Sequence, residues 1–206
     1  MITFLEKVYE LMASTNQHDW SKTLVLFPNN RSAYYFKEQL KNKLQVGQIF
    51  PALQTLESLI AQSSIYDKAD SFELIFVLYD IYKKYYPETS LQHFLPVAKT
   101  MLIDFGEIDA ELCPPKGFFR DLQALKSMNV FMEEDEGKAY KYKYFWQAFE
   151  DCYNGLQAYC ALHQRGYSGM QFRDVAERGL DMHANVEYVF CVGFTQLSKS
   201  ELKIVG

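Results

Sequence analysis

The spacing of apolar residues changes twice along the chain and divides it into three parts. Over residues 1–65, short apolar runs typical of buried strands alternate with stripes at the helical period. Over residues 66–183 the pattern is helical nearly throughout. Residues 184–206 return to a strand-like run, at 186–192, which leads into a helix start. We therefore predict an α/β fold in which a parallel sheet is interrupted by a large all-helical insertion.

The first part contains a clear junction between a strand and a helix. The run Thr23–Phe27 is almost wholly apolar, as in a strand covered on both faces of a parallel sheet. Asn29 or Asn30 can cap the helix that follows. A second strand is predicted over 48–54, where a proline favours a sheet edge, and Thr55 can cap the next short helix.

The insertion is predicted from long stripes of apolar residues at helical spacing, which are typical of a bundle core. Capping boxes are predicted at Ser168 with Gln171 and at Ser198 with Glu201. Because the sequence stops one turn into this last helix, we expect it to be a piece of a longer protein. The three longest stripes run through Phe72, Ile75, Phe76, Tyr79, Tyr82 and Tyr86, through Leu91, Phe94, Leu95, Ala98, Leu102 and Phe105, and through Tyr142, Phe145, Trp146, Phe149, Tyr153, Leu156 and Cys160.

Charge is spread unevenly along the 206 residues. The net charge is −5, which is not typical of a protein that coats nucleic acid by charge alone. Residues 61–136 carry a balance of −7, whereas residues 1–60 and 137–206 each carry +1. A nucleic-acid surface is therefore expected on the terminal parts. The 16% aromatic content is the other distinctive number.

The cysteine spacing and the lack of a long apolar run predict a reducing, cytoplasmic environment. The four cysteines are scattered, with no Cys-x-x-Cys pair, which fits a reducing environment better than a disulfide framework or a zinc site. No signal peptide is recognised at the start, and no run reaches the length of a membrane helix. We expect a cytoplasmic protein of bacterial type, with no membrane contact.

Most motifs that could carry chemistry have a simpler structural interpretation. Asp104, Glu107, Asp109 and Glu111 could hold magnesium, but a solvated helix end is favoured. The tripeptide that starts at Asp104, Asp-Phe-Gly, lacks every other kinase motif. No phosphate loop or nucleophile elbow occurs, so neither catalytic residue, metal nor cofactor is predicted. The tract 138–146 interleaves lysines with aromatic residues and suits either base stacking or a helix core.

Three segments together resemble the first domain of superfamily 1 helicases. Leu26–Phe36 resembles the segment in which a strand ends and contacts single-stranded DNA, and Thr55–Leu59 falls at a second motif on the DNA path. Val189–Leu197 falls where the Walker B strand is expected. Further segments resemble a divergent AddB-like group that carries a PD-(D/E)XK nuclease domain at its far C-terminus, namely Leu102–Asp109, Phe145–Trp146, Gly166–Met170, Arg173–Val175 and Val192–Phe194.

The sequence departs from active helicases at the ATP site. A Walker A loop is missing before the first strand, and apolar residues and glycine around Val192 and Gly193 replace the Walker B Asp-Glu. The resemblance therefore implies a RecA-like domain that does not hydrolyse ATP, in a DNA repair and recombination protein. It further implies an AddA-like motor subunit as partner, and nuclease residues beyond residue 206.

The resemblance also implies a set of residues that bind single-stranded DNA. Arg31 would pair with a phosphate, Asn30 would cap the helix and bond the DNA backbone, and Tyr34, Thr55 and Ser58 would line the same path. The alternative from another class is a helical protein–protein interaction module without DNA binding, which the acidic middle part and the many tyrosines favour. An enzyme active by itself is the third possibility.

Overall fold

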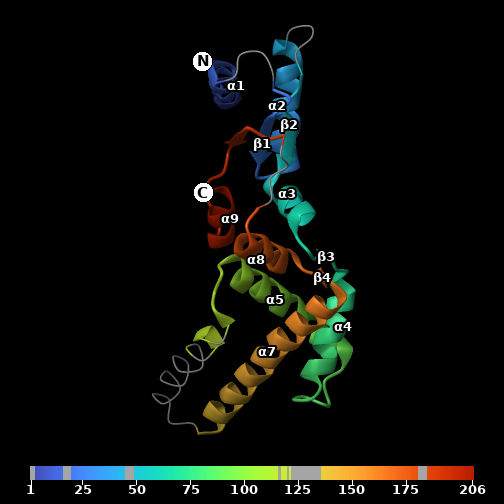
Figure 1. The fold of residues 1–206 in the computed structure, drawn as a ribbon. Coiled ribbons are helices and arrows are strands. Elements are labelled where there is room, and N and C mark those ends of the chain that lie inside the picture. The colour runs from blue at the N-terminus through green and yellow to red at the C-terminus, as the bar shows by residue number, and fades with distance from the viewer. Residues whose placement is uncertain are drawn as a thin grey trace. The chain divides into compact units, whose positions relative to one another are not determined.

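The computed structural model describes a mixed α/β protein that is mostly helical (Figure 1). It describes residues 3–15, 20–44, 49–115, 117–119, 121, 136–180 and 185–206, with the backbone alone over 136–143. The contacts divide the chain into two compact units. The first comprises residues 1–63 and 179–197, and the second comprises residues 64–178 and 198–206.

The first unit contains a three-stranded parallel sheet in the order β2-β1-β5 (Figure 1). β1 (Thr23–Phe27) lies in the middle, with β2 (Ala52–Thr55) on one side and β5 (Tyr188–Cys191) on the other. All five residues of β1 are buried, as expected of an apolar strand covered on both faces. The predicted α/β class with an interrupted parallel sheet is thus confirmed.

Three helices accompany this sheet. α1 is Phe4–Thr15, α2 is Asn30–Lys43 and α3 is Leu56–Ser63, in agreement with the predicted stripes. The helical period turns one face of α1 and one face of α2 inward. They form a core with the central strand that consists of Val8, Met12, Trp20, Val25, Phe27, Phe36, Leu40 and Val192.

The second unit is built from helices, as the long stripes predict. α4 (Ser71–Tyr82) packs on both α5 (Leu91–Ala110) and the long α7 (Glu136–His163), and α8 (Ser168–Arg178) packs on α5 (Figure 1). Its core is rich in aromatic rings, among them Phe94, Phe105, Phe119, Phe149 and Tyr153.

Two short elements complete the second unit. β3 (Asp67–Lys68) and β4 (Arg165–Gly166) pair in parallel. α9 (Lys199–Val205) packs on α8 and α5 and is grouped with this unit, whereas the sequence assigned 184–206 as a whole to the α/β domain.

The two predicted capping boxes have different outcomes. The box of Ser198 and Glu201 is present, with both reciprocal hydrogen bonds. The box of Ser168 and Gln171 is wrong, although a helix does begin at Ser168. Gln171 is buried, and its side-chain amide donates to the carbonyl of Tyr66 at 2.8 Å instead of reaching back to the helix start.

α5 and α8 approach each other backbone to backbone at two glycines. A Cβ atom placed on Gly169 would lie 2.3 Å from the carbonyl oxygen of Gly106 and 2.5 Å from its Cα. A Cβ atom on Gly106 would meet nothing within 4 Å. The glycine at 169 is therefore required for this helix crossing. The Asp-Phe-Gly tripeptide, residues 104–106, lies within α5 and contributes Gly106 to the same contact.

Replacing Gly169 by alanine should destabilise the second unit by about 1–3 kcal/mol, because backbone must move to admit the methyl group. The control is Gly106→Ala, which adds the same methyl group to the other helix in open space. That variant should be neutral, or more stable by up to about 1 kcal/mol from helix propensity. Urea unfolding measures both free energies, and an equal effect of the two substitutions would contradict the proposed crossing.

Candidate nucleic-acid interface

The parallel pairing of β1 and β2 brings two predicted DNA-contacting segments to one edge of the sheet. Phe27, the last residue of β1, is in register with Thr55, the last residue of β2. α2 and α3 therefore both begin at this carboxyl edge. The strand order also reverses at β1, because the chain passes from β1 to β2 on one side and β5 lies on the other. Ligands of open α/β sheets bind at such points.

Asn29, and not Asn30, caps α2. The backbone of Asn29 is extended, with φ −156° and ψ 160°. Its Oδ1 accepts from the backbone N–H of Ser32 at 2.9 Å and from the Ser32 hydroxyl at 3.1 Å. Asn30 is the first helical residue and is exposed. The prediction that Asn30 caps the helix is wrong, because the turn after β1 is one residue shorter than that prediction requires.

The variant Asn29→Ala should lower the free energy of unfolding by about 1 kcal/mol, since it removes a helix cap. Asn30→Ala is the matched control at the neighbouring exposed position and should change stability by less than about 0.5 kcal/mol. Thermal or urea unfolding of both variants gives the comparison. A larger loss of unfolding free energy in the Asn30 variant would contradict the assignment of Asn29 as the helix cap.

α2 is the most basic helix of the first unit, and two of its cations have no carboxylate partner in the part of the chain that the structure describes. It carries Arg31, Lys37, Lys41 and Lys43 against a single acid, Glu38. Lys41 lies 2.5 Å from Glu38, and Lys43 lies 3.5 Å from Glu6 of α1. Arg31 and Lys37 are exposed and remain available for an anionic ligand.

Tyr34 lies between these two cations in the sequence of α2 and presents its ring to solvent. Its side chain is 61% exposed, and it lines a pocket of about 470 Å³ together with Lys37 and Phe50. Phe50 is itself 38% exposed. A pocket that combines aromatic faces with a lysine suits a base that stacks while its phosphate is neutralised. The remaining lining residues are Ala33, Pro51 and Leu53.

Lys37 and Phe50 were missed by the sequence interpretation. Lys37 follows Tyr34 by three residues, so the helical period places both on one face of α2, and this spacing could have revealed it. Phe50 has no comparable signal, because it precedes β2 outside any regular element.

The predicted site residues of the second segment are occupied by local hydrogen bonds. Thr55 is only 7% exposed, and its hydroxyl accepts from the backbone N–H of Ser58 at 3.1 Å, which confirms its predicted capping role. The Ser58 hydroxyl accepts from Gln54 at 3.4 Å and from Gln62 at 3.3 Å. The exposed groups that suit a ligand therefore lie on α2 and on the residues just before β2, and not on α3.

The positions at which the sequence resemblance predicts a Walker B motif lie at the end of β5. Val192 is buried in the core of the first unit, and Gly193 has φ +79°, a left-handed conformation that favours glycine. Within the described residues, no three His, Cys, Asp or Glu side chains are grouped to hold a metal ion.

The Lys- and Tyr-rich tract is described only at its end. The side chains of residues 138–143 lie outside the described residues. Tyr144 is exposed, and its hydroxyl donates to the carbonyl of Tyr85 at 3.3 Å, whereas Phe149 is buried in the core. The helix at this place is confirmed, and a nucleic-acid role for the tract stays a prediction.

The second unit contains a buried ion pair between Asp109 of α5 and Arg173 of α8. Asp109 is fully buried, and its Oδ1 accepts from Arg173 Nε at 2.8 Å and from the Tyr153 hydroxyl at 2.6 Å. Its Oδ2 accepts from Gln157 at 2.8 Å and from the Tyr167 hydroxyl. Both carboxylate oxygens therefore have donors, and no lone pair is directed to solvent or to a metal.

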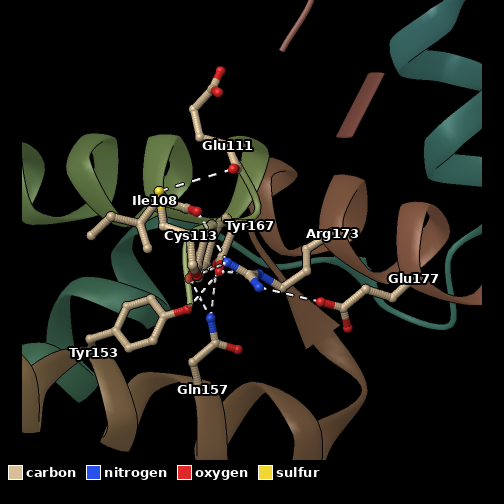
Figure 2. A network of polar contacts seen from close by, with 9 residues as sticks. Ile108, Glu111, Cys113, Tyr153, Gln157, Tyr167, Arg173 and Glu177 are labelled. Atoms are coloured by element: carbon tan, nitrogen blue, oxygen red, sulfur yellow. Dashed lines mark hydrogen bonds and ion pairs between the residues drawn. The ribbon is translucent and has the colours of Figure 1, made fainter. Parts of the chain in front are cut away.

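Arg173 extends the network to the backbone. Its Nη2 donates to the carbonyls of Ile108 at 3.1 Å and Cys113 at 2.6 Å, which are the carbonyls near the end of α5 (Figure 2). Burial is the largest influence on the pKa of Arg173 and lowers it, but the charge and hydrogen bond of Asp109, together with Tyr153 and Glu177, outweigh burial, and the pKa is raised. Burial, and then Asp109, raise the pKa of Tyr153 and Tyr167, so both phenols remain protonated donors.

The interpretation of Asp109 as part of a solvated helix end is wrong. Asp109 follows the core residue Phe105 by one helical turn, so it continues the buried face of α5 instead of leaving it. That spacing is a signal that could have placed it in the core. The cost of burying its charge is offset by the ion pair and three further donors.

Substituting Asp109 by Asn should destabilise the second unit by about 3 kcal/mol, because it leaves the Arg173 charge buried and unpaired. Glu177→Gln is the control: Glu177 Oε1 lies 3.3 Å from Arg173 Nη1, but its side chain is 57% exposed. The control should cost less than about 1 kcal/mol. Chemical unfolding of both variants at neutral pH measures these changes. Similar losses of unfolding free energy in the two variants would contradict a dominant stabilising role for the buried ion pair.

Comparison with known proteins leaves the family open. No family model, curated protein or solved structure matches the chain. In the described residues, no helix is both long and apolar enough to cross a membrane.

Proposed function

We propose that residues 1–63 with 179–197 are a non-catalytic, RecA-like helicase domain of an AddB-type DNA repair helicase–nuclease, which binds or guides single-stranded DNA. The observation that carries the proposal is the exposed set of Arg31, Tyr34 and Lys37 on α2, which begins at the carboxyl edge of a parallel sheet and continues to the pocket at the start of β2. The set supplies cations and an aromatic face in a chain whose overall charge is negative.

Each residue of this set has a distinct role in the proposal. Arg31 pairs with a phosphate near the start of α2, where the helix dipole and free N–H groups also favour an anion. Tyr34 stacks on a base, and Lys37 neutralises the next phosphate. Asn30 is exposed beside Arg31 and can bond the DNA backbone. Thr55 and Ser58 stabilise the start of α3 and do not contact the DNA in this proposal, because their hydroxyls already accept hydrogen bonds within the protein.

The wider assignment rests on the sequence resemblance. In this proposal an AddA-like motor subunit supplies ATP hydrolysis, and the present chain supplies a passage for the DNA and a scaffold for the partner. The nuclease step in double-strand break processing belongs to residues outside this sequence.

Arg31→Ala should weaken binding to a single strand of ~20 nucleotides, and the slope of log K against log salt should become shallower by about 0.7 for the lost phosphate contact. Fluorescence anisotropy at two salt concentrations measures both quantities. Lys99→Ala removes an equal charge from an exposed position of α5 and is the matched control, with a smaller expected effect. Equal effects of the two substitutions would contradict a specific role for Arg31.

A second candidate function is a protein–protein interaction module without DNA binding. It is favoured by two exposed aromatic residues one helical turn apart on α4, Phe72 at 64% and Phe76 at 52% exposure. Aromatic residues in such positions are common in protein interfaces. The same titration separates the candidates: absence of binding at low salt, together with co-purification of a protein partner, selects this one.

A further inference from the structure

The chain passes between the two units at three crossings, after Ser63, after Arg178 and after Leu197. Two of these crossings lie at the ends of helices, because α3 ends at Ser63 and α8 ends at Arg178. Hinges are commonly placed at such element ends, where a few residues absorb a change in backbone angles. Relative motion is the ordinary expectation for two units joined in this way. The residues that bind these two crossings therefore determine how much of the chain can flex.

Asp174 of α8 binds residues from both of these crossings. Its Oδ2 accepts hydrogen bonds from the Ser64 hydroxyl at 2.9 Å and from the backbone N–H of Ile65 at 3.0 Å. Its two oxygens also accept from Arg178, with Nε at 2.7 Å from Oδ1 and Nη2 at 2.8 Å from Oδ2, which is a bidentate ion pair. One carboxylate thus joins the first two residues after one crossing to the last residue before the other. All four residues belong to the second unit.

The position of Asp174 is explained by these partners and not by the helix that carries it. An acidic side chain near the C-terminal end of a helix opposes the helix dipole. The side chain of Asp174 is only 7% exposed, which adds a desolvation cost. Burial raises the pKa of Asp174, but the hydrogen bonds from Arg178, Ile65 and Ser64 outweigh it, and the pKa is lowered. The carboxylate is therefore charged at neutral pH and fully used by donors from the two crossings.

A second contact fastens only the first crossing. Gln171, which precedes Asp174 by three residues on α8, donates its side-chain amide to the carbonyl of Tyr66 at 2.8 Å. The backbone N–H of Tyr66 in turn donates to the Ser64 hydroxyl at 3.1 Å. The segment 64–66 is therefore bound by two side chains on one face of α8. Because the Gln171 contact does not involve Arg178, it allows the two crossings to be separated by experiment.

We propose that Asp174 is a clasp that anchors the first and second crossings together on α8 and restricts flexing of the chain to the residues beyond it. With the clasp closed, Ser64, Ile65 and Arg178 move with the helical core of the second unit. Opening the clasp releases both crossings in one step, because a single carboxylate binds both. Gly179 lies directly outside the clasp and has φ +89°, a left-handed conformation that glycine adopts without strain. The clasp does not depend on the DNA contact proposed for α2.

Amide hydrogen exchange tests the first crossing. Because Ile65 donates its N–H directly to Asp174, the variant Asp174→Ala should raise the exchange rate of this amide by about tenfold or more. The amide of Phe105, in the core of the same unit, should change far less. Glu177→Ala is the matched control, since it removes an exposed acid from the same helix, and it should leave the Ile65 rate unchanged. An unchanged Ile65 rate in the folded Asp174 variant overturns the proposal.

Trypsin cleavage tests whether the second crossing opens in the same step. Trypsin cuts after arginine, and the side chain of Arg178 is bound by Asp174 beside the bond to Gly179. Asp174→Ala should accelerate cleavage of this bond by about tenfold or more, measured by mass spectrometry of the fragments. Gln171→Ala should loosen the segment 64–66 and leave the cleavage rate unchanged. Equal acceleration by the two variants, or none in the Asp174 variant, overturns the proposal.

The variant Asp174→Asn replaces Asp174→Ala in both experiments if the alanine variant fails to fold. It keeps the size of the side chain and one acceptor oxygen, and it removes the charge that binds Arg178. Both rates should then rise in the same direction by a smaller factor. Rates equal to those of the unmodified protein overturn the proposal.

The distribution of distances between two spin labels tests the consequence for the two units. One label is attached to the exposed Cys191 of the first unit and the other to the variant Lys99→Cys of the second, with Cys113→Ser to remove a half-buried thiol. The other two cysteines are buried. Asp174→Ala should broaden the distribution, whereas Glu177→Ala should leave its width unchanged. Equal widths in all proteins overturn the proposal, and they leave the DNA-binding proposal unaffected because no residue of α2 is changed.

Discussion

The complete burial of β1 is the constraint on which the first unit depends. A strand covered on both faces and paired along both edges can offer groups to a ligand only at its ends. At the carboxyl end, Asn29 caps α2 and fixes its rotation, so that Phe36 and Leu40 enter the core. The same rotation leaves Arg31 and Tyr34 exposed. Packing and the proposed DNA contact are thus two consequences of one helix orientation.

In the second unit, α5 combines two opposite uses of acidic residues. Asp109 is buried and fully paired, and with Arg173 it joins α5 to α7 and α8. Asp104 and Glu107, less than two turns earlier on the same helix, have no ion-pair partners in the described structure and line a pocket. The close approach of Gly169 to Gly106 fixes the position of α5 against α8.

The sequence predicted the elements well and the polar contacts poorly. Period and capping located β1, α2 and α7, because burial of apolar side chains dominates local structure. The sequence offered both Asn29 and Asn30 as caps, and it does not fix the length of the turn that selects Asn29. The spacing of Asp109 from Phe105 could have placed it on the buried face, but its hydrogen-bond donors come from α7 and α8. Such tertiary partners are not encoded in local spacing. The pocket at Tyr34 needed Phe50, which no periodic pattern marks.

Photo-crosslinking tests the proposed DNA-binding surface of α2 most directly. A single strand that carries 5-bromodeoxyuridine would be irradiated with the protein at low salt, and the modified peptides would be identified by mass spectrometry. The account predicts cross-links to Tyr34 or Phe50, whose rings are exposed at the pocket beside α2. Cross-links confined to residues 64–178, or none at a concentration that saturates binding, would contradict it.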